Sequence, residues 1–355
     1  MSTRVDRTTL GPNDDGRRLD RVLRKYLPDV PLSRIYRALR SREIAVNGKR
    51  ARADTRVFEG DVLEIAETLH SARIRRTEDP ADAGVGASTD QRNDGRKPAA
   101  ATRRAKRESP PALAGRIVFE SRDLIVVNKM RGELTHGPDS LETIVREYLA
   151  GRGAGGVSFR PGPVHRLDRN TSGLVIFAAS LAGAHRAGEA LRTGRLEKRY
   201  LALVEGRLRA ARWEDRLERD ESSRTTGAAG GGGAGGRGGS GGGAGGRVAV
   251  SVVEPVVADR DATLAVIRIE TGRTHQIRAQ AALHGHPLAG DRKYGGHGRS
   301  AYLLHAASLA APAESDIGFE HLEAPLPAAF AERIERVFGA GTLRIASRAL
   351  SGPHE

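Results

Sequence analysis

Residues 163–174 read Pro163-Val164-His165-Arg166-Leu167-Asp168-Arg169-Asn170-Thr171-Ser172-Gly173-Leu174. A carboxylate, Asp168, stands between two arginines, and a small polar run and then an apolar run follow it. Small polar residues favour a turn, and a short apolar run favours a buried strand. The stretch therefore predicts a loop that presents Asp168 at the edge of a sheet, where nearby positive charge keeps it ionised. An N-cap or a surface ion pair is the simpler alternative, and the charge pattern alone favours it.

The sequence around this loop alternates strand-like runs with helical stretches from residue 113 to residue 338. Apolar and β-branched runs of four to ten residues predict strands, and Gly-Pro punctuation predicts where helices end. The expected strands are 117–119 paired with 124–127, then 173–179, 200–204, 248–257 and 263–269, and the expected helices are 181–191 and 274–284.

Three other segments differ in composition from this region. Residues 70–112 have few aliphatic residues and predict a flexible linker, because such a segment cannot bury a core. Residues 227–246 are almost entirely Gly, Ala and Ser, and predict a disordered hairpin extension without an assignable function. The last residues, 339–355, predict a frayed tail.

The N-terminal residues 16–69 predict a small separate module. An amphipathic helix begins near Arg18, and Ser33 is a candidate N-cap for a second helix that ends at Ser41. A turn at Asn47-Gly48 and strands at 44–46 and 62–65 follow. On the second helix Arg34, Arg37 and Arg40 recur every three residues, which is usual for a solvated face but also suits a surface that binds phosphates.

Composition limits the classes of function. The chain has 355 residues, a formal net charge of +14 and a sequence pI of about 10.7, which favour a polyanionic partner such as nucleic acid. It has no cysteine, no apolar run near the ~20 residues needed to cross a bilayer, and no secretory signal. These features predict a cytoplasmic protein. Aromatic residues make up only 4% of the chain, so a broad stacking platform for bases is not expected.

Five ordered motifs give the catalytic region a family resemblance. The string HRLDxxTSGL is the signature of RluA-type RNA pseudouridine synthases, and it occurs here without a substitution. The other four resemble the family's segments in the family's order: KxYxALVxG at 198–206, GRTHQIR at 272–278, PxxGDxxYG at 287–295 and LHA at 304–306.

The resemblance implies an α+β fold in which a large, mixed, mainly antiparallel sheet flanked by helices follows a small N-terminal module. It implies that Asp168 is the essential carboxylate, acting on the ribose either as a nucleophile or as a base. Arg278 would pair with Asp168, and Tyr200 would pack on the uracil and could take the proton from carbon 5. The substrate-binding candidates are Arg166, Arg273 and His275. As catalytic groups, His165, His275 and His305 are each better interpreted as structural donors.

The sequence departs from the family pattern at two places. Residues 128–132 read NKMRG where the family usually has NKPxG, so Met130 replaces a proline in a turn. After Ala306 the family's aromatic residue and His-Pro pair are not evident. Both departures affect loop geometry and neither affects a catalytic position.

Residues 17–67 resemble the αL RNA-binding domain first named from a small-subunit ribosomal protein. The order of two helices, a VNG turn and a Gly-Asp before the last strand carries this resemblance. In that family the second helix and the following loop contact structured RNA. The resemblance therefore implies phosphate contacts for Arg34, Arg37, Arg40, Lys49 and Arg50.

The function expected from these patterns is an isomerase that converts specific uridines in structured RNA to pseudouridine. Large-subunit ribosomal RNA is the expected target, and transfer RNA is the alternative. The enzyme is expected to work as a monomer without a cofactor, a metal or a membrane. The competing hypothesis is a non-catalytic RNA-binding ribosome-assembly factor, but such a protein would be expected to have lost one of Asp168, Tyr200 and Arg278. A small-molecule glycosidase lacks its second acid near Asp168.

Overall fold

A computed structural model describes residues 5–71, 113–150, 157, 159–220, 225–228, 246–298 and 300–351. Most of the predicted linker 70–112 and most of the predicted glycine-rich insert 227–246 lie outside the described residues. The chain divides into two compact units, residues 1–112 with 156–159, and residues 113–155 with 160–355. They are called unit 1 and unit 2 below.

Unit 1 combines helices with a small antiparallel sheet of strand order β1-β6-β3-β4 and a separate β2–β5 pair. Apolar residues spaced three and four apart bury one face of α1 and of α2 against this sheet. Ser33 is not the N-cap of the second helix: the helix begins at Leu32 after Pro31, whose φ of −58° already suits a helix start. The elements are β1 Val5–Thr9, β2 Arg17–Arg18, α1 Leu19–Tyr26, α2 Leu32–Arg40, β3 Ile44–Val46, β4 Lys49–Arg50, β5 Arg56–Val57, β6 Val62–Ala66 and α3 Glu67–Ser71.

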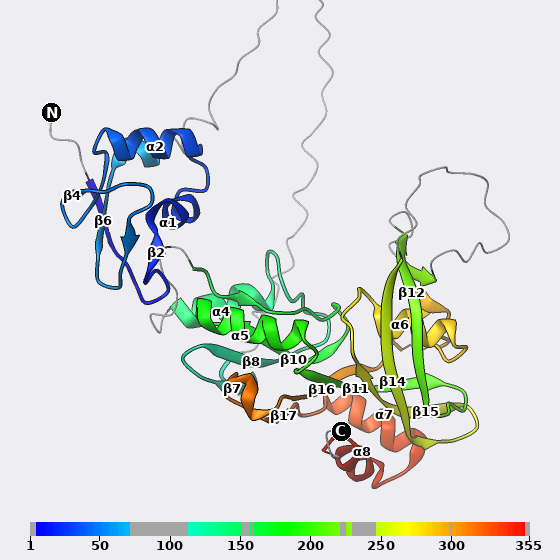
Figure 1. Ribbon diagram of the computed structural model, residues 1–355. Coiled ribbons are helices and arrows are strands. Elements are labelled where there is room, and N and C mark those ends of the chain that lie inside the picture. Colours follow the sequence, from blue (N-terminus) through cyan, green and yellow to red (C-terminus); the bar gives the residue numbers. More distant parts are fainter. Residues whose placement is uncertain are drawn as a thin grey trace, which may run out of the picture. The chain divides into compact units, whose positions relative to one another are not determined.

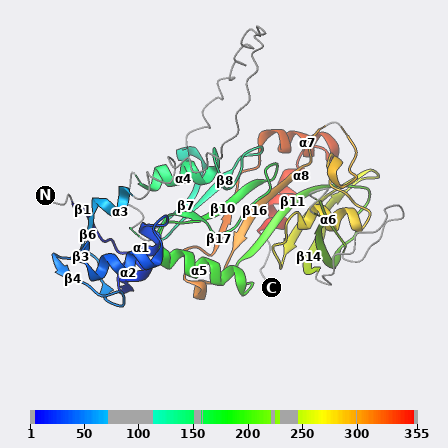
Figure 2. The ribbon, with the colours of Figure 1, turned by 90° about the horizontal axis from the view of Figure 1, so that it is seen from above.

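Unit 2 is built on one sheet of eleven described strands, with the order β13-β12-β14-β15-β11-β16-β10-β8-β7, while β17 pairs with β16 and β9 with β10. Figure 2 shows strands β7, β8, β10, β16 and β11 next to one another within this sheet. The strands are β7 Ile117–Glu120, β8 Leu124–Lys129, β9 Gly162–Pro163, β10 Ser172–Ala178, β11 Glu197–Glu205, β12 Ala211–Asp220, β13 Thr225–Ala228, β14 Arg247–Ala258, β15 Ala262–Ile269, β16 Leu304–Ala310 and β17 His321–Glu323.

The helices of unit 2 cover two faces of the sheet. Residues on one face of β11 and β15 pack with α6, and residues on the other face pack with α7 and α8 (Figure 1). Strand residues alternate between these faces, so Tyr200 and Leu201 of β11 belong to different cores. The helices are α4 Leu141–Ala150, α5 Leu181–Arg192, α6 Gln276–Leu283, α7 Ala328–Phe338 and α8 Thr342–Leu350, with the 3-10 turns η2 Leu113–Arg116, η3 Arg292–Tyr294 and η4 Ala313–Ser315.

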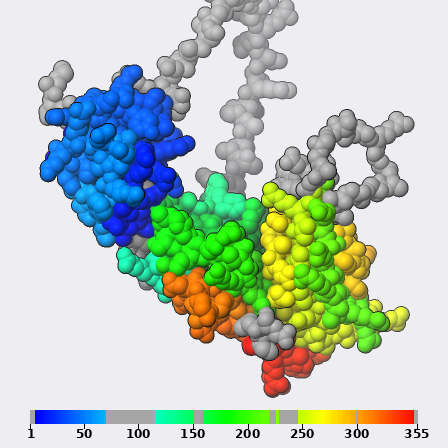
Figure 3. Space-filling model, in the orientation of Figure 1, coloured from blue at the N-terminus to red at the C-terminus, as the bar shows by residue number. Residues whose placement is uncertain are grey.

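The expected frayed tail at 339–355 is wrong for residues 342–350, which form α8. Thr342, Ala346 and Leu350 recur every four residues and are buried in the core between the sheet and α7. Arg199 of β11 donates its Nη1 to the carbonyls of Ala349 and Leu350, 3.4 and 3.2 Å away. Figure 3 shows the residues of α8, in red, as a compact part of the surface.

The predicted fold class is confirmed. All the pairs in the large sheet that the structure describes are antiparallel except β10–β16, whose two residue pairs are Ser172–His305 and Gly173–Ala306. Within the described ranges, no helix is both long and apolar enough to span a membrane.

Candidate active site

Asp168 lies in the loop between β9 and β10, and a second loop, residues 130–135, holds that loop in place. Thr135 both donates its hydroxyl to the Leu167 carbonyl at 3.0 Å and accepts the Leu167 amide at 3.1 Å. Gly132 donates its amide to the Arg169 carbonyl at 2.8 Å. The backbone on both sides of Asp168 is therefore fixed, while the Asp168 side chain remains 19% exposed.

Lys129 supports the same loop from the core. Its side chain is fully buried at the end of β8, and its ammonium donates to the carbonyls of Met130, Glu133 and Arg169 at 2.9, 2.8 and 3.1 Å. Burial lowers the pKa of Lys129 to about 8, although the charges of Glu133 and Asp168 oppose this shift. At neutral pH the side chain is therefore a cation that satisfies three carbonyls, the full donor capacity of an ammonium.

Arg278 of α6 joins two carboxylates. Its Nε and Nη2 donate to the two oxygens of Asp291 at 2.7 and 2.8 Å, and its Nη1 lies 3.4 Å from Oδ2 of Asp168. The guanidinium carbon lies 4.8 Å from the ring centre of Tyr294 and 4.5 Å from that of Tyr302. Burial alone would lower the pKa of Arg278, but the Asp291 hydrogen bonds and the neighbouring charges outweigh it and raise the pKa. Arg278 is a fixed cation beside Asp168.

Tyr200 projects from β11 toward the same carboxylate and is 6% exposed. Burial, with the charge of Asp168 as a smaller cause, raises the pKa of Tyr200. The phenol therefore keeps its proton at neutral pH. This argues against Tyr200 acting as a base from its resting state and favours a role for its ring.

His275 is the residue before α6 and has a left-handed backbone, with φ of 54°. Such a conformation is costly for a residue with a side chain, and it persists only where the surrounding structure holds it in place. Its Nδ1 is 2.8 Å from the Tyr294 hydroxyl, and its Nε2 is 3.8 Å from Oδ1 of Asp168. Burial lowers the pKa of His275, and the charge of Asp168 partly opposes this, so the ring is neutral at neutral pH.

All six predicted catalytic and substrate-binding residues line one small cavity of about 60 Å³, which also contains Ile269 and Leu304. A larger cleft of about 590 Å³ shares Asp168, Arg278, Arg166 and His275 with it. Among the six, Arg273 donates its Nε to the Val248 carbonyl at 2.9 Å. The six are Arg166, Asp168, Tyr200, Arg273, His275 and Arg278.

The two other histidines of the motifs do not line the cavity around Asp168; His165 is half-buried and His305 is fully buried. His165 accepts the Ile176 amide on its Nε2 at 3.2 Å, and His305 has its Nδ1 2.8 Å from the Ser172 hydroxyl. Burial lowers the pKa of His165 to about 3 and that of His305 to about 4. Both rings are neutral and join β10 to neighbouring segments, as a structural role requires.

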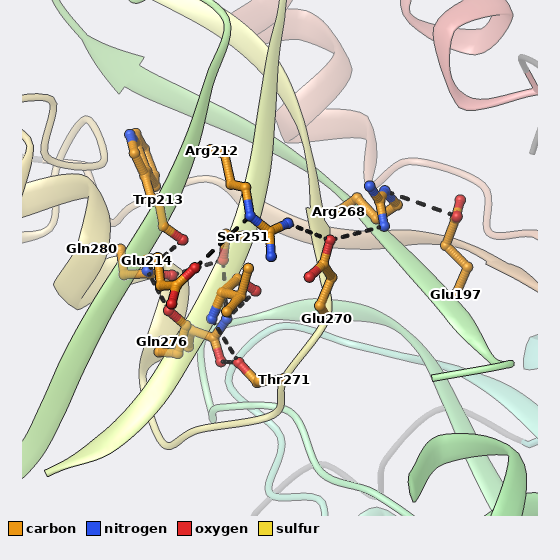
Figure 4. Close-up of polar contacts among 12 residues, drawn as sticks. Glu197, Arg212, Trp213, Glu214, Ser251, Arg268, Glu270, Thr271, Gln276 and Gln280 are labelled. Atoms are coloured by element: carbon orange, nitrogen blue, oxygen red, sulfur yellow. Dashed lines mark hydrogen bonds and ion pairs between the residues drawn. The ribbon is translucent and has the colours of Figure 1, made fainter. Parts of the chain in front are cut away.

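Gln276 and Asp291 lie within the motifs at 272–278 and 287–295, and the sequence alone predicts no role for either. Gln276 accepts the Thr271 hydroxyl at 2.7 Å and donates to the Val250 carbonyl and the Ser251 hydroxyl at 2.9 and 3.0 Å. Ser251 in turn donates to Gln280 at 2.7 Å, so two glutamines tie α6 to β14 (Figure 4). The only signal in the sequence is that both residues are polar and stand within the motifs. Their roles depend on contacts with other parts of the chain, which the sequence does not show.

The predicted RNA-binding residues of unit 1 differ in their surroundings. Arg34 is engaged by Glu43 through both of its terminal nitrogens, which raises the pKa of the arginine. Within the described part of unit 1, no ion pair engages the four other side chains, which are exposed on α2 and β4. These four are Arg37, Arg40, Lys49 and Arg50.

Two parts of the chain match known protein families, and bacterial proteins align with most of its length. Residues 123–283 match the family described as RNA pseudouridylate synthase, and residues 17–63 match the S4 domain. A ribosomal large subunit pseudouridine synthase C of Yersinia pestis is 30% identical over 338 residues, covering 91% of this chain and 92% of that protein. The protein of the same name from Salmonella typhi is 29% identical over 337 residues, covering 89% and 92%.

Solved structures show the same fold. Human RNA pseudouridylate synthase domain containing 1 has a TM-score of 0.50 and 24% identity, and the match covers 68% of this chain and 96% of that one. Human RNA pseudouridylate synthase domain containing 4 has a TM-score of 0.50 and 21% identity, with 64% and 94% covered. With the extent of the Yersinia match, these findings confirm the resemblance to RluA-type enzymes: the chain belongs to the RNA pseudouridylate synthase family.

Proposed function

We propose that this enzyme converts uridines of large-subunit ribosomal RNA to pseudouridine, with Asp168 as its catalytic carboxylate. The target rests on the names of the bacterial relatives, which align with nearly the whole chain. The assignment of Asp168 rests on one observation: the six residues that the motifs nominated line a single cavity around it. The family match favours the enzyme over the non-catalytic assembly factor.

The reaction is an isomerisation in which atoms balance within one nucleotide. The bond between the ribose and nitrogen 1 of uracil breaks, the base turns, and a new bond forms between the ribose and carbon 5. Carbon 5 then loses its proton, and nitrogen 1 gains one. A stacked base hides these atoms, so the uridine must first leave the helix, which costs a few kcal/mol. The cleft beside Asp168 provides room for the extruded nucleotide.

In this proposal four of the six residues have separate roles. Asp168 acts on the ribose, either as a nucleophile or as a base. Arg278 pairs with Asp168 and is itself held by Asp291. Tyr200 packs on the uracil, and its retained proton favours the ring contact over proton acceptance. Arg166, which is exposed beside Asp168, occupies the gap left by the extruded nucleotide.

Unit 1 holds the RNA by phosphate contacts from Arg37, Arg40, Lys49 and Arg50. Arg34 contributes less than the other four because Glu43 already neutralises it. The enzyme acts in the cytoplasm as a monomer, with residues 16–69 as the binding domain and 113–338 as the catalytic domain.

Chemical mapping of pseudouridines in total RNA tests the proposal. Cells with and without the gene are compared by derivatisation and primer extension, and the deletion is complemented with wild type or with Asp168→Asn. We expect particular stops in large-subunit RNA to disappear and to return only with wild type. Loss confined to a transfer RNA would correct the substrate. Stops restored by Asp168→Asn would overturn the role of Asp168.

A further inference from the structure

Lys198 is a cation close to the active site, and the mechanism above assigns it no role. It lies on β11 two residues before Tyr200 and therefore on the same face of the strand. Its backbone pairs with Ile269, which lines the cavity around Asp168. Its Nζ lies 3.9 Å from the point where a side chain of Gly272 would begin, so the ammonium sits against the turn that leads to His275 and Arg278.

The ammonium of Lys198 has no hydrogen-bond or ion-pair partner among the described residues. Its neighbours on the strand, Glu197 and Arg199, point to the opposite face and pair with each other at 2.5 Å. By contrast, two other buried cations near Asp168 are engaged: Lys129 donates to three carbonyls, and Arg278 donates to Asp291. Lys198 thus differs from them in being available to a ligand.

Its surroundings make an unpaired cation costly. Lys198 is partly buried, and burial lowers its pKa to about 8. The titratable group that interacts with it is His165, which burial keeps neutral and which therefore offers no compensating charge. Arg273, which follows Gly272 in the adjoining turn, is itself a cation and donates to the Val248 carbonyl, so it offers Lys198 no negative charge. A desolvated cation without a partner is stabilised by an anion that arrives with the ligand.

RNA supplies such an anion at every nucleotide. Two residues along a strand span about 7 Å, so the side chains of Lys198 and Tyr200 leave the same face of β11 at points about that far apart, which is similar to the length of one nucleotide. We propose that Lys198 binds a backbone phosphate of the substrate RNA next to the extruded uridine. This inference rests on the proposed function, because it takes the uridine to lie on Tyr200. It adds to unit 2 a specific phosphate contact within the catalytic domain.

The salt dependence of RNA affinity tests this contact. Each phosphate neutralised by a cation adds about 0.7 to the slope of log affinity against log salt for a single strand. Affinities are measured across a KCl series for a transcript that contains the mapped uridine, with every variant in the Asp168→Asn background so that the RNA is not turned over. We expect Lys198→Met to weaken binding about tenfold at low salt and to reduce the slope by about 0.7. Lys198→Arg should keep the slope.

Arg336→Met is the matched control. Arg336 is exposed on α7, which packs on the face of the sheet opposite Tyr200, so its loss should leave both the affinity and the slope unchanged. Thermal unfolding of each variant separates a folding defect from a lost contact. If Lys198→Met unfolds, the pH series on wild type and Lys198→Arg decides the question.

The pH series tests whether binding requires the protonated, positively charged form of Lys198. Between pH 7 and pH 9 the free Lys198 loses its charge, so wild-type affinity should fall above about pH 8. Lys129 titrates in the same range in both proteins, so Lys198→Arg should show a smaller fall than wild type, and the difference reports Lys198. An unchanged slope in Lys198→Met, or equal pH dependence in wild type and Lys198→Arg, overturns the phosphate contact.

Turnover of the same transcript by the enzyme with an intact Asp168 is measured in parallel. An active enzyme with an unchanged salt slope refutes only the role of Lys198, whereas an inactive one also refutes the proposed function.

Discussion

Arg278 is shared unequally by two carboxylates. Asp291 is 2% exposed and holds the guanidinium through two short hydrogen bonds, while Asp168 is more exposed and meets it once, at 3.4 Å. Asp291 therefore fixes the orientation of Arg278. Asp168 accepts only one contact from the arginine, so its carboxylate can still act on the ribose. Asp291 is a positioning residue that acts through the arginine.

Asp291→Asn should slow catalysis while leaving RNA affinity nearly intact. The asparagine keeps the shape but removes the charge that anchors Arg278, and a displaced catalytic group costs about a hundredfold in rate. Breaking this buried pair should also lower the free energy of unfolding by about 3 kcal/mol. Single-turnover rates, binding titrations and urea unfolding measure the three effects. Glu270→Gln is the control, because it breaks only partly exposed ion pairs, those with Arg212 and Arg268, and should cost about 1 kcal/mol or less. A wild-type rate in Asp291→Asn would contradict the anchoring role.

His305, which is fully buried, and His165, which is half-buried, make the stability of unit 2 depend on pH. The folded-state pKa of His305 is about 4 and that of His165 about 3, both below the ordinary value of 6.5. Between these values the unfolded chain binds protons that the folded chain does not, so stability is lost as pH falls from about 6.5 toward 4. Urea unfolding at a series of pH values should show this loss.

In His305→Asn, the number of protons taken up on unfolding between pH 6.5 and pH 4 should be smaller by about one, so the free energy of unfolding should change less with pH. The variant is expected to be less stable than wild type at every pH. The amide can still meet the Ser172 hydroxyl, but it does not titrate. His297→Asn is the control: Glu205 raises the pKa of this exposed histidine, so its removal should not weaken the dependence. If His305→Asn and wild type lose stability in parallel, protonation of His305 is not the cause.

At the scale of elements, the junction between β10 and β16 places the catalytic loop. The parallel pairing has only two residue pairs, and the loop that carries Asp168 ends at its first strand residue, Ser172. Gly173 permits the close approach: a Cβ there would lie 2.2 Å from the carbonyl oxygen of Ala306, and φ is +114°. The glycine of the HRLDxxTSGL motif is therefore required by packing.

Gly173→Ala should destabilise unit 2 by about 4 kcal/mol, because a backbone clash adds to an unfavourable φ. It should also reduce activity, since the strand must shift and the Asp168 loop moves with it. Gly188→Ala is the matched control, because this glycine lies within α5 with open space around its Cα. That change should instead raise the free energy of unfolding by about 0.5–1 kcal/mol. Thermal unfolding and turnover measure both variants, and equal stabilities would show that the junction tolerates a side chain.

The elements that the sequence predicted correctly are those with local signals. Alternation and apolar runs placed β7, β8, β10, β14 and β15 to within about two residues at most ends. Helix α8 is only nine residues long and follows a glycine, and its apolar face is short. For these reasons the sequence alone predicted a frayed tail. Its partners, Leu201 and Leu203 of β11, lie about 140 residues earlier in the chain, and no local pattern reveals such a surface.

For the whole molecule, the order of the motifs predicted the family, the fold class and the six residues of the cavity. The order did not show that β10 pairs with β16 or that Asp291 anchors Arg278. Those contacts join residues that are 13 to 133 positions apart, and the chain must fold before they exist. Sequence thus nominated the reacting groups, whereas the residues that orient them came from the structure.

The two-unit organisation predicts that RNA binding and chemistry are separable. Deleting residues 1–70 should weaken RNA affinity and reduce its salt slope by up to about three, as four exposed cations are lost at about 0.7 each. The rate on a minimal substrate at saturating concentration should change little, since the residues around Asp168 belong to unit 2. A full-length variant with Arg37, Arg40, Lys49 and Arg50 replaced by alanine controls for any folding defect of the truncated chain. It should lose the salt slope to a similar extent while its unfolding temperature stays near that of wild type, because these side chains are exposed. Equal salt slopes for wild type and both variants would show that unit 1 does not touch phosphates, and the excess positive charge of the chain would then act elsewhere.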